Sequence, residues 1–191
     1  EIADFSPLKS LDRITLSAVK EVMDTSEFKP ELHQICRIYR PSGLKARNLL
    51  LIGAGRRSAF DPSKLREIAG IAVRRAKNYA AKTVAILCRG VNAPGLAARL
   101  AAEGALYGNY ESDIYRTRDR ENRDIEKFCI LLAGKAPRAE IEDGIRRGTI
   151  VGDATNLARS LGNEPSNILT PTQFAQRAST LGEKSGVAVQ I

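Results

Sequence analysis

Short apolar runs alternate with helical apolar stripes along much of the chain. The runs at 47–53, 83–88 and 127–132 have the length and unbroken apolar character of strands that are buried on both faces. Residues 33–39 alternate loosely and predict a further strand, which Pro41 and the serine and glycine after it end. Because helical stretches separate the later strands, the sequence predicts an α/β fold with right-handed crossovers and a largely parallel sheet.

Helical spacing of apolar residues occurs in three stretches before residue 110. The first covers residues 8–23. The second begins at Asp61, which can accept from free backbone N–H groups, and at Pro62, which suits the first helical position. Its inward stripe consists of Leu65, Ile68, Ala69, Ala72, Val73 and Ala76. The third opens at Pro94, and its inward residues are Leu96, Ala97, Leu100, Ala101 and Ala105.

The chain changes character after residue 136. Residues 137–162 predict one long helix, which at about 1.5 Å per residue is long enough to join two domains. Its apolar side is formed by Ile141, Ile145, Ala154, Leu157, Ala158 and Leu161. A capping box at 170–173 then opens a helix that Gly186 ends, and residues 187–191 begin a strand. The inward residues of this last helix are Phe174, Ala175, Ala178 and Leu181.

Composition narrows the class of protein. Only 5% of the residues are aromatic and Trp is absent, so the core is built from Ala, Leu, Ile and Val. The apolar runs fall far short of the roughly 20 residues that span a bilayer, so we expect no membrane partner. Cys36, Cys88 and Cys129 are widely spaced and predict buried reduced thiols. Together with an acidic start unlike a secretory signal, they predict a cytoplasmic protein.

Positive charge is concentrated between residues 37 and 102, where fourteen Lys or Arg face only Asp61 and Glu67. Two interpretations are open. The basic region can contact an anionic partner such as nucleic acid, or it can be a solubilising face or a surface paired with an acidic neighbouring subunit. No nucleic-acid recognition motif accompanies it.

The residues do not form a familiar catalytic or metal-binding pattern. His33 is the single histidine, and neither an H-E-x-x-H sequence nor a cysteine pair is present. The carboxylates Glu140, Glu142 and Asp143 lie beside Arg138, Arg146 and Arg147, which predicts solvated ion pairs. Gly53 and Gly55 follow a strand but lack the third glycine and the later acidic residue of a dinucleotide loop. We therefore predict no catalytic, cofactor-binding or metal-binding residue in this chain.

Several segments nevertheless resemble one enzyme family. Residues 49–55, the helix from Asp61 with its 65–70 segment, and residues 83–86 look like the N-terminal domain of the leucine (cytosol) aminopeptidases. The stretches 103–110 and 113–118 resemble the family's small-residue and tyrosine segment. The most specific similarity lies in 156–159 and 163–171, which resemble the end of its interdomain helix and the start of its catalytic domain.

The resemblance implies a fold and a division of the chain. The chain is expected to fold as a macro-domain-like three-layer α/β sandwich with a largely parallel sheet, followed by a long linker helix. The expected parts are an N-terminal macro-like domain over 1–136, the linker over 137–162 and a truncated start of the catalytic domain over 163–191. The family's first strand is expected before residue 1, so both ends look cut.

The resemblance also implies a function for the parent protein. It would be a metal-dependent leucyl aminopeptidase with two divalent ions, Zn or Mn, held by a catalytic domain outside this chain. These 191 residues would contribute to assembly and to active-site access and would have no activity of their own. Their partners would be the catalytic domain and the sister subunits of a hexamer, and the parent protein would bind a peptide substrate. The alternatives are a macro-like module that binds nucleic acid or ADP-ribose-type ligands through residues 37–102, and a stand-alone interaction domain.

Overall fold

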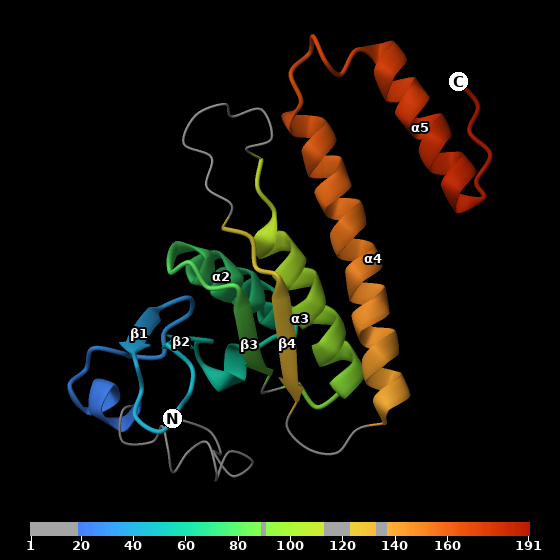
Figure 1. Ribbon diagram of the computed structural model, residues 1–191. Helices are drawn as coiled ribbons and strands as arrows, with labels where there is room; N and C mark the ends of the chain where they lie inside the picture. The colour runs from blue at the N-terminus through green and yellow to red at the C-terminus, as the bar shows by residue number, and fades with distance from the viewer. Residues whose placement is uncertain (1–18, 89–90, 113–122, 133–136) are drawn as a thin grey trace.

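The computed structural model describes residues 19–88, 91–112, 123–132 and 137–191 (Figure 1). Residues 19–24 are helical and overlap the end of the helix predicted at 8–23, whose residues 8–18 lie outside the described residues. The elements that follow are β1 (Ile35–Tyr39), β2 (Asn48–Ile52), the 3-10 turn η2 (Arg57–Ala59), α2 (Lys64–Asn78), β3 (Thr83–Cys88), α3 (Pro94–Asn109), β4 (Lys127–Leu132), α4 (Arg138–Asn163) and α5 (Pro171–Ser185).

The strands form two separate pairs. β3 and β4 run parallel, with Thr83 opposite Lys127 and Cys88 opposite Leu132, as the α/β prediction requires. β1 and β2 pair antiparallel instead, with Ile35 opposite Ile52. The link between them, residues 40–47, is shorter than the dozen or so residues that a parallel crossover needs, so these strands form a hairpin.

Helices α2 and α3 cover one face of the β3–β4 pair (Figure 1). The core between them consists of Leu65, Ala69, Ile86, Cys88, Ala97, Leu100 and Ala101. The predicted stripe of α2 is therefore confirmed, with Ile68 only partly buried. Leu96 was expected to face inward and is exposed, because α3 turns its alanines and glycines toward its neighbours.

Helix α4 runs alongside α3 in the same direction and packs on it through glycine (Figure 1). Its buried residues are Gly144, Gly148 and Gly152, which recur every fourth position on one face. A Cβ atom at Gly148 would lie closer than 3.0 Å to the Arg99 carbonyl oxygen and 2.9 Å from the Cβ of Ala102. The two backbones approach closely only because no side chain intervenes.

The prediction that the apolar side of α4 is its packing face is therefore wrong. Leu157 has 42% of its surface exposed, and Ile145 and Ile150 are exposed too. Contact with α3 is made by residues that a hydrophobicity pattern treats as neutral, so the larger side chains point elsewhere. The predicted long helix itself is confirmed to within one residue at each end.

Helix α5 lies apart from the α2–α3–α4 stack (Figure 1). Thr170 Oγ1 accepts from the Gln173 N–H at 3.3 Å, and Gly186 ends the helix with a left-handed φ of 68°, both as predicted. Phe174 is 52% exposed and Leu181 is exposed, so their predicted inward placement is wrong; no described element covers them.

The residues after α5 do not form the predicted strand. The Val187 N–H donates to the Gly182 carbonyl at 2.9 Å, which completes a Schellman motif with Gly186. Val189 packs back against Gly182, so the segment folds onto its own helix and pairs with no strand of the described chain. None of the described helices is long and apolar enough to cross a membrane.

Candidate functional site

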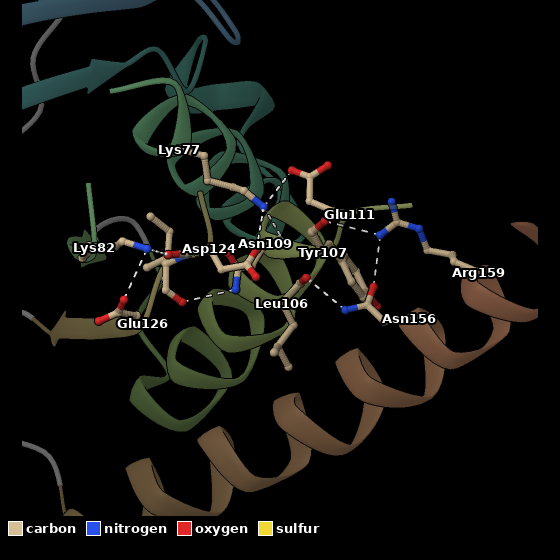
Figure 2. A network of polar contacts seen from close by, with 11 residues as sticks. Lys77, Lys82, Leu106, Tyr107, Asn109, Glu111, Asp124, Glu126, Asn156 and Arg159 are labelled. Atoms are coloured by element: carbon tan, nitrogen blue, oxygen red, sulfur yellow. Dashed lines mark hydrogen bonds and ion pairs between the residues drawn. The ribbon is translucent and has the colours of Figure 1, made fainter. Parts of the chain in front are cut away.

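The C-terminal end of α3 is the meeting point of four segments (Figure 2). The last four carbonyls of a helix have no partner within it, and the end of the helix favours positive charge. Three side chains donate hydrogen bonds to carbonyls at this end of α3. Lys77 Nζ donates to Asn109 O at 2.8 Å, Asn156 Nδ2 to Leu106 O at 3.0 Å and Arg159 Nη1 to Tyr107 O at 3.3 Å. They tie α2 and α4 to α3.

Lys77 is the buried member of this group, with only 4% of its side chain exposed. A buried ammonium is costly unless it is paired. Its Nζ lies 2.7 Å from Glu111 Oε1 and 3.2 Å from Asp124 Oδ1, on either side of the segment 113–122. The lysine therefore fixes the two ends of the connection between α3 and β4.

Asn109 reinforces the same connection. Its Oδ1 accepts from the Ile125 N–H at 2.9 Å, and its Nδ2 donates to the Ile125 carbonyl at 3.3 Å. This paired arrangement imitates a strand partner for the backbone just before β4. The end of α3 thus sets where β4 begins.

A shallow hollow opens beside this network. It encloses about 510 Å³ and is lined by Arg74, Tyr110, Glu111, Ser112, Arg159, Gly162 and Asn163. The guanidinium of Arg159 lies 4.1 Å from the centroid of the Tyr110 ring, and Asn163 Nδ2 donates to the Tyr110 hydroxyl at 3.0 Å. The hollow offers fixed donors and charge. It contains no nucleophile paired with a base among these lining residues.

The opposite end of α3 is also joined to α4. Glu140 Oε1 accepts from the Gly95 N–H at 2.9 Å, where the first turn of α3 leaves a free donor. The solvated ion pairs predicted nearby are confirmed: Arg138 with Glu142 at 2.7 Å, and Asp143 with Arg146 at 2.6 Å and with Arg147 at 2.7 Å. Glu140 differs from its neighbours because it bridges two helices.

The sequence predicted that His33 lies in a strand, and this prediction is wrong. His33 precedes β1 with a left-handed φ of 65°, and its Nε2 lies 3.0 Å from Glu67 Oε2. The exposed pair is a surface contact between the loop and α2. Among the residues that the structure describes, no group of three or more His, Cys, Asp or Glu could hold a metal ion.

The glycine loop after β2 is explained by packing. The N–H groups of Gly53 and Gly55 donate to the carbonyls of Gln34 and Pro30, so neither faces an anion. A Cβ at Gly53 would collide with the Glu31 backbone, and Gly55 has a φ of 76°. These contacts account for both glycines without a nucleotide.

The three cysteines are free thiols. Cys88 is buried in the core, and burial raises its thiol pKa to about 11. Burial and, to a lesser degree, the nearby Glu27 charge also raise the pKa of Cys36. High pKa values keep these two thiols protonated and unreactive near neutral pH.

The residues around the end of α3 were not predicted as a site. Lys77 follows Val73 by four residues and so continues the inward stripe of α2, which was the available indication. Asn156, Arg159 and Asn163 are spaced three and four apart and share one face of α4. This polar stripe on one face of the predicted helix could have indicated that α4 contacts the end of α3.

Comparison with known proteins identifies the family. The family model described as the cytosol aminopeptidase family, N-terminal domain, matches residues 1–119. The "Probable cytosol aminopeptidase" of Acidobacterium capsulatum is 35% identical over 178 residues, which are 92% of this chain and 35% of that protein. That of Alkaliphilus metalliredigens is 30% identical, over 95% of this chain and 37% of the relative.

Solved structures agree with these relatives. A tomato leucine aminopeptidase mutant superimposes with a TM-score of 0.78 at 25% identity, over 95% of this chain and 35% of that one. The bottromycin maturation enzyme BotP in complex with Mn gives 0.68 at 26% identity, over 85% of this chain and 33% of that one. The chain spans about a third of the length of the curated relatives that it matches. It belongs to the cytosol aminopeptidase family, whose N-terminal domain it carries.

Proposed function

We propose that this chain is the N-terminal, non-catalytic part of a metal-dependent leucyl aminopeptidase, which releases N-terminal residues from peptides in the cytoplasm. The observation that carries the proposal is the family match over residues 1–119 together with relatives about three times as long. In this proposal residues 1–136 form the N-terminal domain, 137–162 the linker helix and 163–191 the start of the catalytic domain.

The metal chemistry belongs to the remainder of such an enzyme. Hydrolysis by two metals needs several carboxylates that converge on ions about 3.5–4 Å apart. The described part of this chain lacks such a cluster, so its residues do not fit a metal pair. The Mn named for the similar BotP structure supports a divalent metal in the parent protein, and we propose two such ions, Mn or Zn.

The outer surfaces of α4 and α5 support a role in assembly and active-site access. Ile150 is 57% exposed on α4, and Leu157, Phe174 and Leu181 are exposed on the two helices. Groups of exposed large apolar residues mark protein contacts. Helix α4 is bonded to both ends of α3, so it is a firm base for such contacts. We propose that these surfaces meet the catalytic domain and sister subunits of a hexamer.

A pair of substitutions on α4 tests this role. In the longer protein, Ile150→Ser should reduce the assembled mass measured by light scattering and lower kcat/KM for a leucine amide. In the isolated chain the same change should alter stability by less than about 0.5 kcal/mol, because the side chain is exposed. Asp153→Ser, at an exposed position of the same helix, is the control. Unchanged mass and activity in Ile150→Ser would contradict the proposed contact.

The binding-module alternative receives less support from the contacts of the basic region. Among the described residues of this region, four cations form ion pairs within the chain: Arg66 and Arg99 with Glu103, Lys77 with Glu111 and Asp124, and Lys82 with Glu126. Arg37 lies 3.9 Å from the centroid of the Tyr79 ring. These groups stabilise the fold, so nucleic-acid or ADP-ribose binding stays a prediction.

A further inference from the structure

The hollow between the ends of α3 and α4 has a feature that packing does not explain. Arg74 lines it and is exposed, yet it forms no hydrogen bond or ion pair with any described residue. Arg159 lines the same hollow. Two guanidinium groups beside one cavity repel each other unless an anion or solvent lies between them.

Arg159 is held in place by several contacts. Its Nη1 donates to Tyr107 O at 3.3 Å and to Asn156 Oδ1 at 3.1 Å, and its guanidinium stacks on Tyr110. Figure 2 shows the side chain reaching from α4 toward the end of α3. Its Nε and Nη2 are used in none of these bonds, so donors remain in a fixed fork.

The one carboxylate in the lining does not cancel this charge. Glu111 Oε1 lies 2.7 Å from the buried Nζ of Lys77, which is itself outside the lining. Asp124 also contacts this lysine at 3.2 Å. Lys77 and its two carboxylates together carry a formal charge of −1, and the two arginines carry +2, so these described groups leave a net charge of +1 beside the hollow.

We propose that this hollow binds a small oxyanion, a phosphate or carboxylate group held between Arg74 and Arg159. The planar guanidinium fork suits both groups, because each presents two oxygens to it. Ser112 and Asn163 line the hollow and can add hydrogen bonds to a third oxygen or to the rest of the ligand. A volume of about 510 Å³ admits a small molecule that carries such a group.

The test titrates the 191-residue chain with inorganic phosphate and, separately, with citrate, at matched ionic strength in chloride. Amide chemical shifts of the lining residues report binding, and calorimetry gives the affinity. Arg74→Gln is the diagnostic variant because Arg74 supports no described contact, so the fold should keep its Tm. Arg75→Gln removes the same charge from the neighbouring exposed position, which does not line the hollow.

The proposal predicts saturable shifts at Tyr110, Gly162 and Asn163 with at least one of the two anions. Arg74→Gln should weaken binding roughly tenfold or more, as expected for lost hydrogen bonds to a charged group. Arg75→Gln should weaken it by less than about twofold, since its charge is screened by solvent. The tighter anion identifies the ligand as phosphate or carboxylate. Equal losses in the two variants, or no saturable binding of either anion, overturn the proposal.

Discussion

Replacing Gly148 by alanine tests the close packing of α4 on α3. The added methyl group would lie closer than 3.0 Å to the Arg99 carbonyl oxygen and 2.9 Å from the Ala102 Cβ, so the helices must separate. Overpacking of this kind costs about 1–3 kcal/mol, and alanine returns up to about 1 kcal/mol in helix propensity. We expect a net loss of about 1–2 kcal/mol. For a chain of this length the Tm falls by about 2–8 °C.

Gly162 provides a matched control in the same helix. A Cβ there meets nothing within 4 Å, so Gly162→Ala gains only helix propensity and should raise the Tm by about 1–4 °C. Thermal unfolding followed by circular dichroism measures both variants. Hydrogen exchange should show faster exchange in α4 of Gly148→Ala, with β3 and β4 protected. If both alanine variants are stabilised alike, the backbone contact between α3 and α4 is not what fixes α4.

Two further substitutions and one labelling experiment test the core and the polar network. Glu103→Gln should lower the free energy of urea unfolding by about 1–3 kcal/mol, because its buried carboxylate accepts from Arg66 at 3.2 Å and Arg99 at 2.8 Å; an unchanged value refutes this. Asn109→Ala should cost a similar amount, about 1–3 kcal/mol, and speed hydrogen exchange in β4 before α4; equal protection of β4 in variant and parent argues against it. Cys88, with its pKa raised to about 11, should resist iodoacetamide in the folded chain at about pH 8 and react once urea unfolds it; rapid labelling of the folded chain, located by mass spectrometry, contradicts its burial.

Elements set by local sequence were predictable. The strands β3 and β4 fall where the apolar runs predicted them, since each run has the length of a strand between turn residues. Helix α5 begins at Pro171 because the Thr170 cap and the proline act within one turn. Asp61 precedes α2 and accepts from the Ser63 N–H at 2.8 Å, although the regular helix starts only at Lys64. Hydrogen bonding to the Ser63 side chain and, to a lesser degree, to this N–H lowers the pKa of the Asp61 carboxyl.

Features set by tertiary contact were not predictable in the same way. The packing face of α4 was misassigned because hydrophobic periodicity gives no weight to glycine, while the fourfold spacing of Gly144, Gly148 and Gly152 carried the information. The network at the end of α3 joins residues distant in sequence, such as Lys77 and Asp124. Sequence spacing could place such residues on a helix face but could not show which carbonyls they meet.

Hydrolysis of leucine p-nitroanilide tests the central claim most directly. The 191-residue chain and a longer protein that contains it are assayed side by side with Mn²⁺ or Zn²⁺, and again after chelation. We predict metal-dependent release of p-nitroaniline by the longer protein and none by this chain, because the described residues offer no metal cluster. Metal-dependent turnover by the 191 residues alone, or inactivity of the longer protein, would contradict the claim that this chain is the non-catalytic part of an aminopeptidase.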